Sequence, residues 1–358
     1  MAFSNFFRRT GFILSKFAVL AFWSFTAPQL AAEPFLEVTW VTVGDAGNTA
    51  DTTGFGAVAD AFRIMTFEWT NGQYAEFLNA VDPQGNNPNS IYNMSMGSNA
   101  RGGISFSAGN ADGTKYAVRA NMGDKPVNFV SWYSAARVAN WVNGGALVFS
   151  TTDATATAPQ NVGAYTLGTA TSGTTPAKNS GASVWIPTEN EWYKAAFYKG
   201  GSTNAGYWDY ATTSDSLPTA VTAGGTGTGS AGSTGNFANY NNVAGWNAQN
   251  GNVTSVGTNG GSSAYGTYDQ AGNLREWNDL GGGTDATKGI RGGSWSSGQV
   301  ALQVTTRTTL DPSSANGDDL GFRLVSVVPE PSSTILVTIA TVCLAMRMRR
   351  ESRKPAGR

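Results

Sequence analysis

Residues 290 to 302 read I-R-G-G-S-W-S-S-G-Q-V-A-L. The apolar pattern over 290–295 predicts a short strand that faces a core. Gly292 and Gly293 would let this strand approach its neighbour closely, and Trp295 offers a large apolar surface for packing. The seven residues that follow contain no thiol and no imidazole. The segment is therefore either a strand that carries catalytic residues or the equivalent strand without them. The rest of the sequence is needed to distinguish these alternatives.

The composition removes most reactive side chains. The chain has 358 residues, no histidine, and one cysteine, Cys343, which lies in an apolar segment near the C-terminus. The remainder thus has no disulfide, no thiol nucleophile, no imidazole base and no imidazole metal ligand. Because 23 basic and 24 acidic residues give a net charge of −1, no basic surface is available to neutralise phosphates, and nucleic acid is not expected as a partner. Chemistry would have to use carboxylates, hydroxyls, amides or the backbone.

The N-terminus, residues 1–32, has the order of a secretory signal peptide. Arg8 and Arg9 precede an apolar stretch over 17–25, and Ala31 and Ala32 follow as small residues. Export with cleavage after Ala32 is predicted. The alternative is a membrane anchor, but the apolar stretch is shorter than the roughly 20 residues that a spanning helix needs.

The C-terminus, residues 327–358, carries a second targeting pattern. Pro329, Glu330 and Pro331 precede an apolar segment over 333–346 and then a basic tail. This order resembles the PEP-CTERM sorting signal. The resemblance implies transient membrane anchoring through the terminal segment, recognition by an exosortase-type sorting protease, and delivery to the cell surface or extracellular space. An ordinary tail anchor is the alternative.

Three helices are predicted between these ends, within the segments 69–81, 126–141 and 185–198. Each starts with a hydroxyl residue that can cap it, and these residues are Thr70, Ser131 and Thr188. Glu189 and Glu191 in the third helix could be paired catalytic carboxylates. A role in the cap and the first turn is favoured, because acidic side chains there complement the helix dipole.

The remaining chain predicts short strands and long loops. Strands are expected over 35–43, 62–67, 290–295 and 320–328. Residues 150–183 and 211–235 are rich in Thr, Ala, Ser and Gly and poor in large apolar side chains, so they are expected to be surface insertions.

Six segments together carry a resemblance. They are F-E-W-T-N-G-Q-Y-A-E-F-L-N-A-V (67–81), K-P-V-N-F-V-S-W-Y-S-A-A-R-V-A-N-W (125–141), W-I-P-T-E-N-E-W-Y-K-A-A (185–196), Y-G-T-Y-D-Q-A-G-N-L-R-E-W (265–277), I-R-G-G-S-W (290–295) and L-G-F-R-L (320–324). In this order they resemble the formylglycine-generating enzyme, or sulfatase-modifying factor, family. The resemblance implies one α+β domain of the C-type-lectin-like kind over residues 33–326, with little regular secondary structure, long loops, buried tryptophans and bound calcium.

The same resemblance bears on catalysis. Enzymes of this family that oxidise a sulfatase cysteine to formylglycine carry two copper-binding cysteines after the G-G-S-aromatic motif, at the positions of Ser297 and Leu302 here. A hydroxyl and an isobutyl group cannot replace a thiolate as a soft, redox-active copper ligand. Relatives that use iron need histidines, which this chain lacks. Neither copper nor iron is expected, and the strand is predicted to remain without its oxidase chemistry.

The calcium ligands that the family resemblance implies are present in part in this sequence. For a first site they are the Asp269 and Glu276 carboxylates and the Gly272 and Leu274 carbonyls. All are oxygens, as a hard cation requires. The alternative is that Asp269 and Glu276 only pair with arginines such as Arg275 or Arg291. A second site would use Asn239, the Tyr240 carbonyl, Asn250 and the Asn252 carbonyl, although the family normally has an acidic residue at the position of Asn250.

A binding groove is implied beside the strand, with Arg291 and Ser294 at its border, Trp295 as its floor and Ser297 next to them. A purely structural role for Trp295 is favoured, and the role of Arg291 stays open. We expect an exported, surface-sorted binding or structural module that recognises peptide or glycan outside the cell. The alternative is an enzyme on the same scaffold, either a formylglycine-generating oxidase or a hydrolase that uses carboxylates such as Glu276, Asp279 or Asp209.

Overall fold

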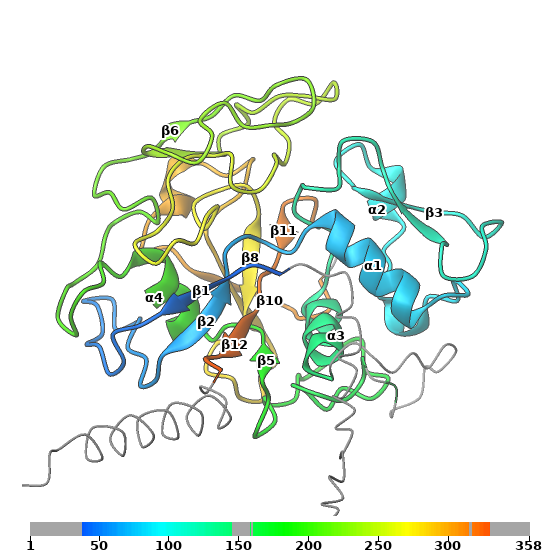
Figure 1. Ribbon diagram of the computed structural model, residues 1–358, viewed down its shortest axis with the longest axis horizontal. Helices are drawn as coiled ribbons and strands as arrows, with labels where there is room; N and C mark the ends of the chain where they lie inside the picture. Colours follow the sequence, from blue (N-terminus) through cyan, green and yellow to red (C-terminus); the bar gives the residue numbers. More distant parts are fainter. Residues whose placement is uncertain (1–37, 145–157, 159, 315–316, 330–358) are drawn as a thin grey trace, which may run out of the picture. The chain divides into compact units, whose positions relative to one another are not determined.

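Two small four-stranded sheets organise the part of the chain that the computed structural model describes, residues 38–144, 158, 160–314 and 317–329. The first sheet has the order β1 (Trp40–Val43), β2 (Phe62–Met65), β12 (Val325–Val327) and β5 (Val184–Trp185), with every pair antiparallel. The second has the order β10 (Thr308–Leu310), β9 (Lys288–Arg291), β8 (Arg275–Asn278) and β11 (Leu320–Gly321), and only β11 and β8 run parallel. Both sheets therefore join distant parts of the sequence (Figure 1).

Two further strand pairs lie outside these sheets. They are β3 (Ile104–Phe106) with β4 (Tyr116–Val118), which is antiparallel, and β6 (Thr219–Ala220) with β7 (Phe237–Ala238), which is parallel. Long turns connect them, and the described residues all fall within one compact unit. The mixed α+β architecture with short strands agrees with the predicted C-type-lectin-like fold.

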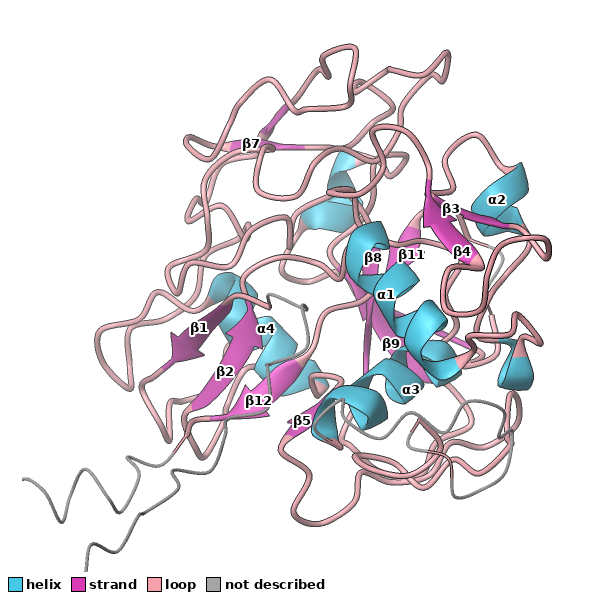
Figure 2. Cartoon of the chain, turned by 45° about the vertical axis from the view of Figure 1, so that its right-hand side comes forward, coloured by secondary structure: helices cyan, strands magenta, loops and turns pink. Residues whose placement is uncertain are grey.

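All three predicted helices form where their caps indicated. They are α1 (Asn71–Val81), α3 (Trp132–Asn143) and α4 (Glu189–Phe197), capped by Thr70, Ser131 and Thr188. α1 and α4 have full capping boxes, in which Gln73 and Glu191 return a bond to the cap residue. Short turns of helix occur at α2 (Ser95–Ser98), η1 (Pro88–Ser90) and η2 (Gln299–Leu302). Figure 2 shows α1 beside β4 and α3 beside β5, with α4 beside β1 and β2.

The predicted strands are shorter than expected. β9 ends at Arg291 because Gly292 and Gly293 adopt φ values of +96° and +71°, which a strand does not allow. Trp295 therefore lies in a turn after the strand, so the prediction of a strand through 295 was wrong at its C-terminal end. The segment 320–328 is likewise split into β11 and β12.

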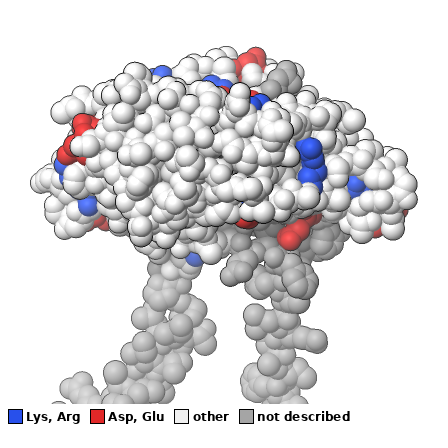
Figure 3. All heavy atoms as spheres, turned by 90° about the horizontal axis from the view of Figure 1, so that it is seen from above, with Lys and Arg blue, Asp and Glu red and all other residues white. Residues whose placement is uncertain are grey.

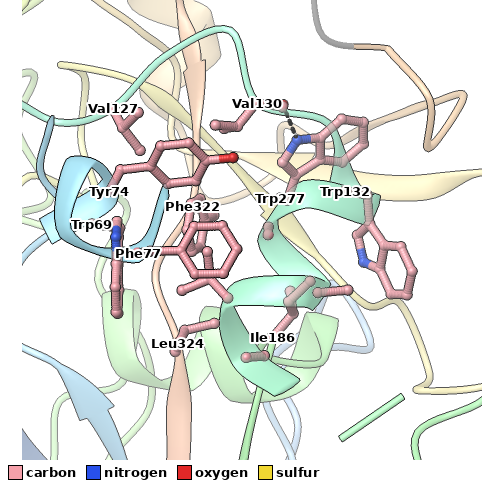
Figure 4. Packing of buried hydrophobic residues seen from close by; sticks show 14 of the residues in the cluster. Trp69, Tyr74, Phe77, Val127, Val130, Trp132, Ile186, Trp277, Phe322 and Leu324 are labelled. Atoms are coloured by element: carbon pink, nitrogen blue, oxygen red, sulfur yellow. Dashed lines mark hydrogen bonds between the residues drawn. The ribbon is translucent and has the colours of Figure 1, made fainter. Parts of the chain in front are cut away.

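Buried tryptophans join the elements. Trp69, Trp132, Trp192 and Trp277 are each fully buried. Figure 4 shows side chains from α1, α3 and the sheets meeting around Phe322, with the Trp277 indole N–H donating to the Val130 carbonyl at 3.0 Å. Truncation of such a side chain to Ala typically costs about 3–5 kcal/mol of stability, so these rings are a major part of what holds the unit together.

The expected surface insertions contribute more than predicted. Tyr165 is fully buried, its ring contacts Trp132 edge-on at 5.0 Å, and its hydroxyl donates to Asp279 at 2.8 Å. Val221, from the second run, is also buried. Their sparse large side chains are therefore core residues, a correction to the prediction that these runs build no core. Residues 150–157 and 159 of the first run lie outside the described residues.

Candidate functional site

A buried acidic cluster lies where both sheets and α4 meet. Glu68 follows β2, Asp269 lies in the turn before β8, Glu276 is on β8, and Arg323 lies between β11 and β12. Glu68, Glu276 and Arg323 have no solvent exposure, and Asp269 is partly exposed. Three carboxylates thus face one guanidinium in a largely dry interior.

Glu276 is held on both oxygens. Arg323 donates from Nη2 to Oε1 at 2.6 Å and from Nε to Oε2 at 2.7 Å, and the Trp192 indole donates to Oε2 at 2.8 Å. Burial alone would lower the pKa of Arg323, but Glu276, Glu68 and Asp269 raise it. The partner of Glu276 is therefore Arg323, and neither Arg275 nor Arg291 makes this contact.

Glu68 is a site residue that the sequence analysis missed. Its Oε1 accepts from the Leu274 N–H at 3.0 Å and its Oε2 from Asn273 Nδ2 at 2.8 Å. Burial raises the pKa of Glu68 well above its usual range, and the nearby Asp269 and Glu276 charges raise it further. The only signal in the sequence was a glutamate between Phe67 and Trp69, where an apolar run would be expected to continue.

The turn that leads into β8 is fixed by close backbone contacts. Asp269 adopts a φ of 63°, and its oxygens accept from the Gly257 N–H at 2.6 Å and Asn259 Nδ2 at 2.8 Å. Gly272 has a φ of +88°, and a Cβ there would lie 2.2 Å from the Asn239 carbonyl oxygen. Only glycine fits this position.

The oxygen ligands that the resemblance implies for the first calcium site are of the kind that binds a hard cation. Asp269 and Glu276 lie in the same cluster as Glu68, and burial raises the pKa of Asp269 as well. Arg323 is the counter-ion of Glu276, and burial raises the pKa values of Glu68 and Asp269, so a divalent cation beside them would stabilise their charged forms. Within the described residues, however, no three acidic side chains converge on one point as a ready-made metal cage. A cation would have to take backbone carbonyls as further ligands, and those implied by the family resemblance are Gly272 and Leu274.

The residues that the resemblance implies for a second calcium site are brought together only in part. Asn239 Nδ2 donates to the Asn252 carbonyl at 2.9 Å, and Asn239 Oδ1 is buried with no hydrogen-bond partner in the described part of the chain. Tyr240, the next residue in the sequence, is buried as well. Asn250 is exposed, and its carbonyl accepts from Arg101 Nη2 at 3.2 Å. The orphaned Asn239 oxygen is the feature that best fits a cation here.

The residues of the expected groove face the protein interior. Arg291 is buried, pairs with Glu189, and donates to the Val304 and Thr306 carbonyls at 3.0 and 2.8 Å. Its guanidinium also lies over the Tyr193 ring at 4.8 Å. Glu189 is thus an ion-pair partner in addition to a first-turn residue, a role that the sequence analysis did not foresee.

The other three groove residues contact the chain's own groups. Ser294 is buried, and its hydroxyl lies 3.0 Å from that of the half-buried Ser297. Trp295 is buried, and the Arg101 guanidinium covers its ring at 4.1 Å. Arg101 in turn pairs with Asp318 at 3.2 Å. Side chains and an ion pair therefore occupy the space beside these residues.

The two positions that the family resemblance assigns to the copper-binding cysteines, Ser297 and Leu302, differ in environment. Leu302 lies on η2, is fully buried and packs in an apolar cluster with Trp192 and Tyr193. Ser297 donates its backbone N–H to the Ser294 carbonyl at 3.0 Å. Neither position presents a soft metal ligand.

The other candidate carboxylates are a structural pair and a surface group. Asp279 and Lys288 form an ion pair with no exposed side chain, and burial raises the pKa of Asp279 to about 6. Asp209 is exposed and lines a hollow of about 400 Å³ with Asp215 and Gln303. Charged side chains are otherwise scattered, and the face in Figure 3 is mostly uncharged.

The predicted terminal signals fall almost wholly outside the described residues. Residues 1–32 do so entirely, and of the sorting motif only Pro329, which is exposed, is described. None of the helices found in the described ranges has the length and apolar character needed to cross a membrane.

The comparisons agree with the motifs. A family model described as a sulfatase-modifying factor enzyme 1-like domain matches residues 28–328, and the chain therefore belongs to this family. No curated protein matches the chain.

Solved structures similar to this one include three with low sequence identity. Treponema denticola variable protein 1 is 19% identical, with 82% of this chain and 96% of that chain covered and a TM-score of 0.46. CarF is 20% identical, with 82% and 100% covered and a TM-score of 0.48. PvdO from Pseudomonas aeruginosa is 17% identical, with 82% and 93% covered and a TM-score of 0.38.

Proposed function

We propose that this chain is a non-oxidising member of the sulfatase-modifying factor family that serves as a binding or structural module outside the cell. The observation that carries the proposal is the pair Ser297 and Leu302, which stand where the oxidising enzymes have their copper-binding cysteines. The burial of Leu302 among aromatic side chains supports it, because a thiolate centre at this position would need a polar, accessible environment.

Calcium is the proposed structural ion. The carboxylates of Asp269 and Glu276 and the carbonyls of Gly272 and Leu274 would hold it, with Asn239 contributing to a second site. When bound, calcium supplies positive charge that fixes the turns around it, and no redox or acid–base step. The surplus of buried carboxylates around Arg323 supports this assignment.

The proposed location is the cell surface or extracellular matrix. The signal-like residues 1–32 and the Pro329-Glu330-Pro331 motif with its apolar and basic sequel support export, followed by sorting through an exosortase-type protease. The chain would touch the membrane only through its terminal segments. The long loops on a rigid base suit recognition of peptide or glycan.

The oxidase alternative gives the sharpest test. Purified protein is incubated with copper, oxygen and a cysteine peptide that carries the sulfatase motif, and the peptide is analysed by mass spectrometry for formylglycine. The proposal expects none. A Ser297→Cys/Leu302→Cys double variant shows whether the scaffold can carry the chemistry once both thiols are present, and turnover by the unmodified chain would overturn the proposal.

A further inference from the structure

Asn–Gly pairs are the places where a folded chain is most open to spontaneous chemical change. The Gly nitrogen attacks the Asn side-chain carbonyl carbon, a five-membered succinimide forms, and ammonia leaves. Water then opens the ring to give Asp or isoaspartate. The reaction needs an Asn side chain that is free to turn and a Gly N–H that no acceptor holds, because a structured pair must first open locally.

The sequence has five such pairs, and the structure describes both residues in four of them. In three, the chain's own hydrogen bonds hold the glycine nitrogen: Gly72 N donates to Gly123 O, Gly144 N to Asn140 O, and Gly260 N to Gly232 O, each at 3.0 Å. The three asparagines are engaged as well. Asn71 donates to the Met122 carbonyl, Asn143 accepts from the Ser183 N–H, and Asn259 donates to Asp269.

Asn250–Gly251 differs in both respects. Asn250 is exposed, and its side chain makes no hydrogen bond within the described ranges. The Gly251 N–H likewise has no acceptor there. Only the two carbonyls of this pair are held, by Arg101, at 3.2 Å for Asn250 and 3.0 Å for Gly251.

We infer that Asn250–Gly251 is the deamidation site among the four Asn–Gly pairs that the structure describes. The products would alter a tightly packed place. A would-be Cβ on Gly251 lies 2.7 Å from Asn242 Cα and 2.9 Å from Trp295 Cε3, so there is no room for displacement. Isoaspartate adds a backbone methylene next to this contact and turns the Asn250 main-chain carbonyl, which Arg101 holds, into a free carboxylate. Arg101 already bridges Trp295 and Asp318. Deamidation would therefore change the conformation of the Asn250–Gly251 loop beside Trp295 as the protein ages.

The test is a time course on the full chain in mildly alkaline buffer, digested and analysed by mass spectrometry for the exchange of an amide for an acid. Asn71 and Asn259 in the same digest are internal controls. We expect Asn250 to convert at least about tenfold faster than either control in the folded protein, because the controls must open first. In urea the three rates should converge. Asn250→Gln should remove the signal from its peptide and leave the control peptides unchanged; Gly251→Ala is not used because a Cβ does not fit.

Two results would overturn the inference. One is a folded protein in which Asn250 converts no faster than Asn259, including the case in which neither converts while the unfolded chain does. The other is an advantage for Asn250 that persists unchanged in urea, since local sequence and not the fold would then be its cause.

Discussion

Arg323 and Glu276 form a two-point ion pair in which neither side chain is exposed to solvent. The charge of Arg323 also lowers the pKa values of Glu68 and Asp269, against the larger effect of burial. The pair ties the segment between β11 and β12 to β8, and the remaining guanidinium N–H groups reach the Met65 and Tyr268 carbonyls at 3.1 and 2.8 Å. One residue thus links distant segments of the unit.

Replacement of Arg323 by Met should therefore be severe. It leaves Glu276 without its buried counter-charge, and loss of one member of such a pair typically costs about 3–5 kcal/mol. The measurement is the free energy of unfolding in urea. Arg275→Met is the matched control, since Arg275 pairs with Asp319 at 2.7 Å while 28% exposed, and should cost less than about 1 kcal/mol. Equal losses in the free energy of unfolding for the two variants would show that the buried carboxylates do not depend on Arg323 as their counter-charge.

Calcium should stabilise the protein. A ligand present at about 100 times its dissociation constant adds about 2.7 kcal/mol to the free energy of unfolding, and EGTA should remove that gain and lower the Tm. Asp269→Asn should abolish most of the response. Asp112→Asn, a change to a carboxylate that is 66% exposed, should leave it intact. A Tm that is the same in calcium and in EGTA contradicts the proposed metal site.

The Asp279–Lys288 pair should make the cost of a substitution depend on pH. Because burial raises the pKa of folded Asp279 to about 6, its contribution to stability is present below about pH 4, the unfolded value, and is lost as the pH rises through 6. Lys288→Met removes the cation that limits this loss. The variant should therefore cost about 3–5 kcal/mol at pH 8, and clearly less at pH 5, where Asp279 can be neutral.

Denaturant unfolding at both pH values checks this expectation. Lys199→Met is the control, because its ammonium lies 3.9 Å from the exposed Asp215 and its removal should cost less than about 1 kcal/mol at either pH. A Lys288→Met cost that does not change between pH 5 and pH 8 would show that Asp279 does not titrate in this window.

The close approach at Gly272 should tolerate no side chain. Gly272→Ala would place Cβ 2.2 Å from the Asn239 carbonyl in a left-handed backbone conformation, so a loss of more than about 3 kcal/mol is expected. At Gly281 nothing lies within 4 Å of a Cβ, and Ala there should change stability by less than about 0.5 kcal/mol. Thermal unfolding of both variants decides whether the turn before β8 is as rigid as its contacts indicate.

Local signals in the sequence predicted local structure well. The helices begin directly after their predicted caps, Thr70, Ser131 and Thr188, because a cap and its first turn depend on residues only three apart. The end of β9 was misplaced because the pattern of apolar residues continues through Gly292 and Gly293, whereas the backbone turns there. Tyr165 was missed because one large side chain in a polar run carries no periodicity.

The candidate site was harder to predict because its contacts are distant in sequence. Asp269 and Glu276 were recognised through the motif that contains both. Glu68 lies more than 200 residues from the Leu274 N–H that it accepts from, and the Arg291–Glu189 pair spans 102 residues. No spacing rule joins residues so far apart, so the direction of Arg291 and the membership of Glu68 required the three-dimensional structure.

The central claim is that this scaffold keeps its structural ion and has lost its oxidising metal. Elemental analysis of protein purified from its native source, without added metals, tests it most directly. The account predicts stoichiometric calcium, with copper and iron at background. Stoichiometric copper or iron in the protein would contradict it.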